Sequence, residues 1–563
     1  MMERSPGNVL RWLFDSRYGA HGRLIPRWMV LRAVGLIYFS AFFVLLFQIR
    51  GLIGPEGILP AGHYLSEVKA SFGGLGRYWF APSLFWISAS SHAMMTVIWI
   101  GIAASVAAFL NLWPRLTLFI CWVCFLSFVC TAQVFSGYQS DGMLLEAGFI
   151  ALFFAPGGLL PGWGAQSLPS RASLILLQWE WFRIYFESGI VKLLSGDPEW
   201  RHLTAMDAYY QNGPLPTWIG WYAQHFPHWF QVATAGATLV MELGLVFMLF
   251  FPRRVRIVCF FIVTPWEIGV ILTGNYAFLN YLVVTLGFLL LDDRSLLWLV
   301  PRRWRPAEQV AFPEPEFKEE VPLSILALPE PNTAAPDRAT VELARAHATW
   351  RAKLGRHLRA ISMAACALLL IWVAYDTTAE LIAMPFGGIG PIFGRPVQAL
   401  DPFRIANQYG LFAVMTRGRY EIEFQGSNDE SNWTPYPFQY KPQALNQAPG
   451  IYAPYQPRFD WNLWFASLGG WQQNEIVPIT EERLLVGDPA VLSLFKGNPF
   501  LRMPPRYVRA VLWQYWFTGM AEKRQTGNWW RRSFIGLYAP ELTVLPDGRF
   551  AVVEWPPQLP AHD

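Results

Sequence analysis

Residues 28–47 read WMVLRAVGLIYFSAFFVLLF, a mostly apolar run that contains one charged residue. About 20 such residues in a helix cross the hydrocarbon core of a lipid bilayer. The run is too long for the apolar part of a cleavable signal peptide, and no small-residue cleavage site follows it. It therefore predicts a retained membrane helix near the start of the chain.

Eight further stretches have the length and composition expected of membrane helices. Together with the first, at 28–48, they lie at about residues 93–112, 115–135, 142–156, 172–194, 229–251, 256–273, 278–299 and 359–382. Hydrophobic residues make up 53% of the chain and charged residues 15%, which is too apolar for an ordinary soluble protein. The sequence predicts a polytopic α-helical membrane protein with about nine membrane helices, so membrane lipids are expected partners.

Arginines in the short loops predict the orientation, because loops rich in positive charge stay on the cytoplasmic side. Five of them precede the first helix: Arg4, Arg11, Arg17, Arg23 and Arg27. Nine alternating crossings place the other basic loops, at 115, 171, 253–256 and 294–305, on the same side. The N-terminus is therefore expected in the cytoplasm, and the loop at 195–228 is expected outside it.

The chain divides into four predicted parts. Residues 1–304 hold the first eight helices, 305–357 a Pro- and Glu-rich cytoplasmic linker, 358–384 the ninth helix and 385–563 an outer domain. The linker composition is typical of segments that bury too little apolar surface to become ordered. Its end, about 341–358, is expected to be partly helical and to lead into the ninth helix.

The outer domain has a different residue pattern. Short runs that alternate polar and apolar residues, such as 419–425 and 549–555, are separated by turn residues and predict strands. Stretches near 460–468, 487–496 and 505–514 are expected to be helical. We therefore expect an extracytoplasmic, aromatic-rich α+β domain with a β-sandwich-like portion.

Several functional classes find little support in the sequence. The net charge is only +4 and the arginines lie near the ends of apolar segments, which does not favour nucleic-acid binding. The pair Cys121-x-x-Cys124 lies in an apolar run without a polar partner, so packing is favoured over redox chemistry. No histidine has metal-ligand spacing, and no nucleotide-binding or nucleophile motif is present. We therefore expect neither a metal nor a cofactor.

Charged residues at membrane depth are costly and are therefore candidates for function. Glu180, Arg183 and Glu187 have i, i+3, i+7 spacing, which stacks them on one helix face with the arginine between two carboxylates. We favour a structural ion pair over a functional one. Four more carboxylates lie in apolar surroundings, namely Asp141, Glu146, Glu242 and Glu267. An internal polar network with Arg183, Lys192 and tyrosines is expected, and a proton or ion pathway is the alternative.

Lys192 lies near the predicted outer end of the fifth helix. A side chain of this length can extend to the interface and anchor the helix there. If it faces a dry pocket instead, desolvation makes its free amine available as a base. Both possibilities stay open on the sequence alone.

Many strings along the chain resemble those of lipase maturation factors. In the membrane part they are Gln48-x-x-Gly51-Leu-Ile-Gly54-x-x-Gly57-Ile-Leu-Pro60, Leu144-Leu-Glu146-Ala-Gly148-Phe149, Lys192 with Gly196-Asp197-x-x-Trp200-x-x-Leu203-Thr-x-Met206-Asp207, and Gly274-Asn275-Tyr-x-Phe278-Leu-Asn280. In the outer domain they are Asn407-x-Tyr409-Gly410-x-Phe412, Arg458-x-Asp460-Trp461-x-x-Trp464-Phe465-Ala466, Asn498-Pro499-Phe500, Pro504-Pro505-Arg506-Tyr507-Val508-Arg509, Asn528-Trp529-Trp530-x-Arg532 and Ile535-Gly536-x-Tyr538.

The resemblance implies a chaperone-like, non-enzymatic role in the folding or assembly of an exported client protein, expected to be a lipase. Animal members act in the endoplasmic reticulum. Residue usage here suggests a bacterium, so the expected location is the inner membrane with the outer domain in the periplasm. The oligomeric state stays open.

A weaker resemblance concerns Tyr185-Phe186-x-x-Gly189-x-x-Lys192-Leu193, which is similar to the segment of vitamin K-dependent γ-carboxylases that carries their catalytic lysine. It implies an intramembrane enzyme with Lys192 as base, tuned by Glu187, Arg183 and Glu146. A transporter or proton pathway through Glu242, Glu267 and Asp141 is a further alternative. Broken helices in two matching halves, which are typical of such transporters, are not evident.

A maturation factor needs exposed apolar surface to hold an incompletely folded client. Six tryptophans of the outer domain are candidates for this contact, although most are expected in its core: Trp461, Trp464, Trp513, Trp516, Trp529 and Trp530.

Overall fold

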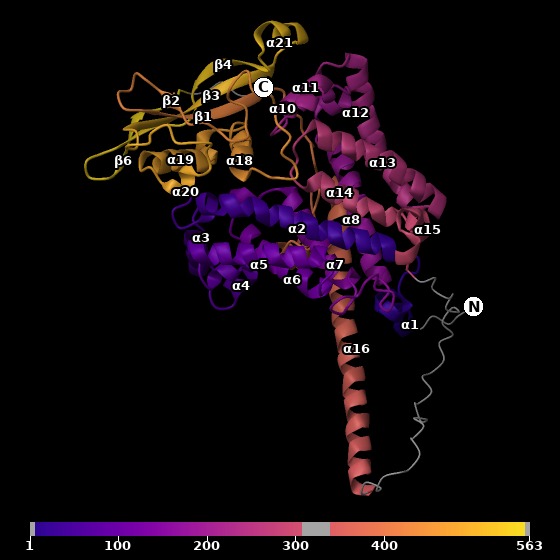
Figure 1. Ribbon diagram of the computed structural model, residues 1–563. Coiled ribbons are helices and arrows are strands. Elements are labelled where there is room, and N and C mark those ends of the chain that lie inside the picture. Colours follow the sequence, from indigo (N-terminus) through magenta and orange to yellow (C-terminus); the bar gives the residue numbers. More distant parts are fainter. Residues whose placement is uncertain (1–5, 307–337, 558–563) are drawn as a thin grey trace.

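The computed structural model describes residues 6–306 and 338–557, which form a helical bundle and a C-terminal sheet domain (Figure 1). The helices up to the sheet are α1 Pro6–Phe14, α2 Leu24–Ile53, α3 Ala61–Ser71, α4 Gly76–Phe80, α5 Ser91–Phe109, α6 Pro114–Val129, α7 Gln139–Phe154, α8 Arg171–Leu194, α9 Pro198–Arg201, α10 Met206–Asn212, α11 Trp218–Gln224, α12 His228–Leu243, α13 Arg253–Thr273, α14 Leu279–Gly287, α15 Asp293–Leu296, α16 Arg338–Ala383 and α17 Pro391–Leu400. The sheet domain contains β1 Arg419–Ser427, β2 Thr434–Pro435, α18 Arg458–Ala466, α19 Ile476–Leu485, α20 Pro489–Leu492, β3 Tyr507–Phe517, α21 Met520–Thr526, β4 Trp530–Leu537, β5 Glu541–Val544 and β6 Phe550–Glu554.

Each predicted membrane segment contains a helix in the structure: α2, α5, α6, α7, α8, α12, α13, α14 or α16. Within the described residues, five helical segments are long and apolar enough to cross a membrane: Leu24–Ile53, Ser91–Phe109, His228–Phe250, Arg253–Thr273 and Ala360–Phe386. Two others, Pro114–Val129 and Leu279–Leu290, are apolar but shorter. The structure therefore confirms several apolar helices in a bundle, while the number nine stays a prediction.

Small residues allow the first helices to approach closely. A Cβ atom at Gly101 of α5 would lie 2.6 Å from the ring of Phe42 on α2, and one at Gly148 of α7 would collide with the Tyr38 hydroxyl. That hydroxyl donates to the carbonyl oxygen of Leu144 over 3.1 Å. Close packing over small residues stabilises helix pairs in lipid, where the hydrophobic effect contributes little. These glycines therefore position α7 beside α2.

The two ends of the bundle differ in their contacts. At one end, arginine side chains donate hydrogen bonds to backbone carbonyl groups of the loops between helices. Arg27 donates to the carbonyl oxygen of Ser167 (2.6 Å) and Arg115 to that of Ala155 (2.8 Å). Arg253 pairs with Asp292 at the same end. At the opposite end, the last turns of α2, the first turn of α7 and the loop before α14 contact the sheet domain, and the last turn of α8 contacts residue 411, which precedes that domain. The basic loops that were predicted to share one side therefore do share one end.

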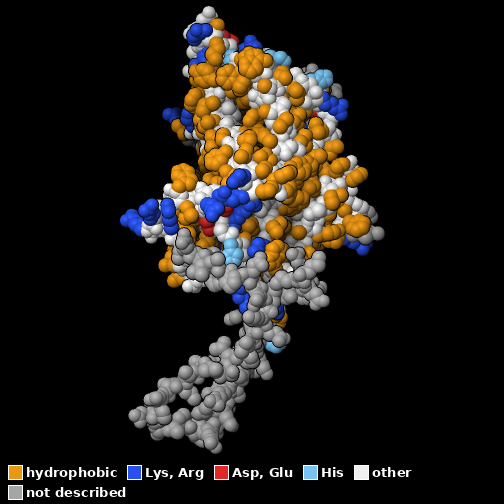
Figure 2. Space-filling view, turned by 90° about the vertical axis from the view of Figure 1, so that its right-hand side faces the viewer, with side chains coloured by type: hydrophobic (Ala, Val, Ile, Leu, Met, Phe, Trp, Pro, Cys, Tyr) orange, Lys and Arg blue, Asp and Glu red, His pale blue; other side chains and the backbone are white. Residues whose placement is uncertain are grey.

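A broad apolar surface covers the side of α12 and α13. Figure 2 shows hydrophobic side chains over most of this side, with Lys and Arg gathered at its lower margin. The exposed side chains here include Trp229, Val240, Phe250, Phe261 and Ile268. Such a surface is suited to lipid, not to water.

The C-terminal domain is built on a single sheet with the order β2-β1-β3-β5-β6, and β4 pairs with β3. Helices α18 and α19 pack on its strands. Within the described residues this helical cover replaces the second layer of the expected β-sandwich portion, so that expectation is wrong. The expected helix at 505–514 is also wrong, because residues 507–514 belong to β3. Val508 and the run Ala510 to Leu512 are buried there, and a short apolar run of this kind fits a buried strand or a helix equally well, so its period does not decide between them.

The predicted linker is only partly covered by the structure. Residues 307–337 lie outside the described residues. From Arg338 to Ala383 the chain forms the single helix α16 of 46 residues, which packs on α8 and α1 and extends below the bundle in Figure 1.

Candidate functional site

Residues 405–416, here called the crossing segment, run over the ends of α7 and α8 and lead into β1. Five of its backbone N–H groups donate to bundle side chains: Asn407 to Glu146 (3.0 Å), Tyr409 to Glu187 (2.6 Å), Gly410 to Gln139 (3.1 Å), Leu411 to Ser188 (3.3 Å) and Met415 to Asp197 (2.6 Å). Irregular backbone that leaves water must find such partners. Carboxylates are strong acceptors for backbone N–H groups, so the bundle fixes this segment in place.

Arg183 lies at the centre of these contacts. Its guanidinium pairs with Glu146, lies 3.7 Å from Glu187 and donates to the carbonyl oxygen of Asn407 over 2.6 Å. The Tyr409 hydroxyl donates to Glu146 over 2.9 Å. All these charged side chains are buried. The arginine thus neutralises carboxylates from two helices while it holds the crossing segment.

Glu180 does not take the place that its spacing suggested. Helix α7 supplies the close carboxylate of Arg183 through Glu146, and the described residues contain no ion pair between Arg183 and Glu180. Glu180 is nevertheless fully buried. The helical period predicts which residues share a face of α8, but it does not predict which neighbouring helix faces them.

Lys192 is buried and points to Glu242 on α12. Its ammonium group lies 2.9 Å from both carboxylate oxygens of Glu242, 3.1 Å from the Ser188 carbonyl and 3.0 Å from the Leu411 carbonyl. A lysine ammonium has three N–H donors, and these acceptors can engage all of them. The side chain therefore does not extend to the interface, and it ties α8 and α12 to the crossing segment.

The loop predicted outside the membrane lies under the same segment. The indole N–H of Trp200 donates to the Phe412 carbonyl over 2.9 Å, and the Asn212 amide donates to the Thr416 carbonyl over 2.7 Å. Arg419, the first residue of β1, donates to the Gln211 carbonyl over 3.0 Å. The loop therefore positions the start of the sheet.

The contacts of the crossing segment with the bundle are the first anchor between the two parts of the protein. The second anchor joins Arg458 of α18 to Asp141 of α7. The guanidinium donates to both carboxylate oxygens, at 2.7 and 2.8 Å, and also to the Phe135 carbonyl at 2.7 Å. Both side chains are buried. The Gln48 side chain accepts from the Arg458 backbone N–H over 2.8 Å, so α2 contacts the start of α18 as well. A buried bidentate ion pair of this kind fixes the orientation of α18 relative to α7 as well as the distance between them.

A third anchor is Asn275, in the connection between α13 and α14. Its side-chain oxygen accepts from the N–H groups of Tyr452 (2.6 Å) and Ala453 (3.0 Å), and its amide donates to the Gly450 carbonyl (2.9 Å). The Asn275 side chain thus satisfies three backbone groups of residues 450–453, as a neighbouring strand would do in a sheet. Together, the three anchors hold the sheet domain against one end of the bundle.

Other charged groups lie deeper. Tyr185 donates to Glu267 over 2.8 Å. Asp376 and Glu380 on α16 were not among the predicted site residues, although their i, i+4 spacing inside the ninth segment was a readable signal. Asp376 is fully buried, and neither of its carboxyl oxygens has a hydrogen-bond partner in the described ranges.

The six candidate tryptophans divide into two groups. Trp461, Trp464 and Trp530 are buried, so they belong to the core. Trp513, Trp516 and Trp529 are half-buried and lie beneath cationic side chains, Arg532, Arg531 and Lys523 respectively. This arrangement leaves little free tryptophan surface for a client.

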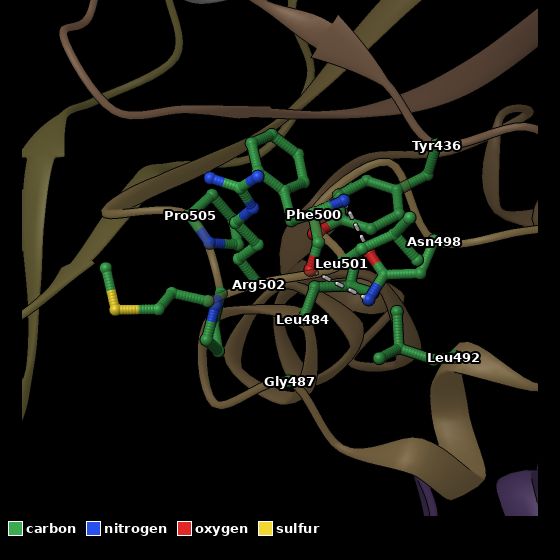
Figure 3. Close-up of a pocket in the computed structure, with 11 residues that line it drawn as sticks. Tyr436, Leu484, Gly487, Leu492, Asn498, Phe500, Leu501, Arg502 and Pro505 are labelled. Carbon is green, nitrogen blue, oxygen red and sulfur yellow. Dashed lines mark hydrogen bonds between the residues drawn. The ribbon is translucent and has the colours of Figure 1, made fainter.

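The sheet domain also contains a pocket of about 160 Å³ beside the Asn498-Pro499-Phe500 string (Figure 3). Asn498 shapes its rim by accepting from the Phe500 N–H (2.9 Å) and donating to the Phe500 carbonyl (3.1 Å). Sites for small molecules usually enclose about 300–1,000 Å³. The pocket has room for one side chain or a few waters, and its lining contains no carboxylate or histidine. It is therefore not a candidate active site.

Several carboxylates of the sheet domain have shifted pKa values, and Asp460 is one of them. Burial raises the pKa of Asp460 to about 6, although the nearby Lys441 and two backbone N–H donors oppose the shift.

Comparison with known proteins covers both parts of the structure. Residues 25–298 match the lipase maturation factor transmembrane domain, and residues 405–540 match the lipase maturation factor C-terminal domain. The second match begins at the first residue of the crossing segment. No solved structure matches the chain.

Relatives from vertebrates match over most of their length. Lipase maturation factor 2 of Gallus gallus is 32% identical over 92% of this chain and 81% of its own length. Lipase maturation factor 2 of Homo sapiens is 30% identical over 93% and 83%, and lipase maturation factor 1 of Bos taurus is 30% identical over 94% and 91%. The anchors described above, from Gln48 to Arg458, fall within the two matched domains. This chain belongs to the lipase maturation factor family.

Proposed function

We propose that this chain is a membrane-embedded maturation factor for exported lipases. The match of both its domains to a family whose members carry that name is the observation that carries the proposal. The position of the sheet domain supports this proposal. Because the domain is held at one end of the bundle, it can bind an exported client close to the membrane surface.

The location follows from charge. We assign the end of the bundle that contains Arg27, Arg115 and Arg253 to the cytoplasm, because loops rich in positive charge resist translocation. The sheet domain, at the opposite end, is then extracytoplasmic. Residue usage supports a bacterial inner membrane with this domain in the periplasm.

Deletion of the gene tests the proposed function. We expect secreted lipase activity to fall while the amount of lipase polypeptide stays unchanged, because the step that is lost is folding and not synthesis. Wild-type protein supplied from a plasmid is expected to restore the activity. Normal lipase activity in the deletion strain would argue against the function.

The alternative of an intramembrane enzyme makes a different prediction for Lys192. Lys192→Met leaves the carboxylate of Glu242, whose side chain is only 14% exposed, without its partner; for a fully buried pair the cost is about 3–5 kcal/mol, so we expect a smaller but still large loss of folded protein. The double variant Lys192→Met/Glu242→Gln removes both charges and is expected to recover most of the folded protein and most of the lipase maturation. A catalytic base cannot be replaced in this way. A folded but inactive double variant would favour the enzyme.

A further inference from the structure

The hairpin β5–β6 forms one end of the sheet. Strand β6 pairs with β5 through Leu542–Val552, Thr543–Ala551 and Val544–Phe550, and no strand of the described ranges pairs with its other side. The ladder shifts beside Val553, which leaves that residue without a direct partner. In Figure 1, β6 projects at the margin of the domain, away from the bundle.

This edge is strongly apolar. Phe550, Val552, Val553 and Trp555 expose 40%, 37%, 42% and 64% of their surface. Val552 and Val553 lie at the shift in the ladder, where the regular alternation of faces is interrupted, and both side chains are exposed. Phe550 to Val553 contain no lysine, proline or charged residue. The features that limit uncontrolled pairing of an edge lie at its far end: the shift at Val553, Glu554, and Pro556 and Pro557 just beyond the strand.

We propose that β6 is a docking edge for an extended, apolar segment of an incompletely folded client, which adds to the sheet as an antiparallel or parallel strand. This inference rests on the proposed function. The unpaired N–H and C=O groups of an edge strand are complementary to another extended backbone, and the apolar side chains favour valine- or threonine-like neighbours.

The size of the edge favours a transient client over a second copy of this chain. Two β6 strands of five residues each would bury far less than the roughly 1,200 Å² typical of stable interfaces. A short edge that releases its occupant readily suits a folding step, since a folded client no longer offers an extended segment.

The experiment uses the full-length protein in lipid nanodiscs and a fluorescent eight-residue peptide of alternating valine and threonine. We expect the peptide to bind, and a version interrupted by proline not to bind, because proline removes a backbone donor. The variant Val552→Lys/Val553→Lys is expected to weaken binding by about tenfold or more, since several cross-strand contacts are lost together. The matched control is Val486→Lys, at an exposed position of the same domain outside the sheet, and it is expected to bind normally.

A photo-crosslinking residue at position 553 reports the occupant directly, and we expect it to label the peptide. Labelling of a second copy or of lipid instead, equal binding of the proline peptide, or no binding to the wild-type protein would overturn the proposal. Full lipase maturation by Val552→Lys/Val553→Lys would also overturn it while leaving the proposed function intact. Loss of the function itself is recognised separately, by normal lipase activity in the deletion strain.

Discussion

The variant Arg458→Ala is expected to release the sheet domain from the bundle and to abolish lipase maturation. It leaves Asp141 buried without a counter-charge and removes the bond to the Phe135 carbonyl. Removing one partner of a buried ion pair costs about 3–5 kcal/mol, a large part of the 5–15 kcal/mol that stabilises a typical protein. We expect secreted lipase activity below about a tenth of the wild-type level and rapid proteolysis of the sheet domain.

Two further variants make this result specific. Arg549→Ala removes an exposed ion pair with Asp547 in the same domain and is expected to change little, because exposed pairs contribute little. Arg458→Asp combined with Asp141→Arg restores opposite charges and is expected to recover part of the activity. Wild-type activity and protease resistance in Arg458→Ala would show that this pair does not hold the two parts together.

The second large effect is expected at Arg183. In Arg183→Leu, the carboxylates of Glu146 and Glu187 are left buried together, and the crossing segment loses the donor to Asn407. We expect no folded protein to accumulate in membranes, as measured by size-exclusion chromatography of a fluorescent fusion. The loss should exceed that of Arg458→Ala, because two buried carboxylates lose their partner instead of one.

Substitutions of Glu146 and Glu180 test whether Arg183 pairs with Glu146, as in the structure, or with Glu180, as the spacing along α8 suggested. Glu146→Gln removes the charge that faces Arg183 and weakens the contact with Asn407, so it is expected to be severely destabilising. Glu180→Gln is expected to be mild, since Glu180 makes no ion pair with Arg183 in the described structure. Equal effects of the two substitutions, or the reverse order, would contradict the assignment.

The helical part of the fold was largely readable from the sequence, because lipid permits little besides long apolar helices. A helix lies at every predicted segment, from α2 to the end of α16. The sheet domain was harder. The stretch Tyr507–Phe517 is strand β3, because its neighbours β1 and β4 supply pairing partners that local composition does not reveal.

The charged residues of the site were named from the sequence, with Arg183, Lys192 and tyrosines as available partners for the carboxylates, but the individual pairs were not, and Arg458 was not among the named partners. Membrane depth singled out Asp141, Glu146 and Lys192 as residues that need partners. The partners are Arg458, Arg183 and Glu242, of which Arg458 lies more than 300 positions along the chain from Asp141. Pairing over such a separation depends on how the domains pack, which no local pattern encodes. The family-like strings contain Glu146, Lys192 and Arg458 but not Asp141, Arg183 or Glu242, and the common location of these residues became evident only in three dimensions.

Hydrogen exchange of the crossing segment tests most directly the claim that the bundle holds the sheet domain through its buried carboxylates. The amides of Asn407, Tyr409 and Met415 belong to no helix or strand, yet each donates to a carboxylate of the bundle. Mass spectrometry of the full-length protein in nanodiscs should therefore find residues 405–416 exchanging about as slowly as β1 and β3, with this protection lost in Arg183→Lys. Exchange of this segment at the rate of an unstructured peptide, while β1 and β3 stay protected, would contradict the account.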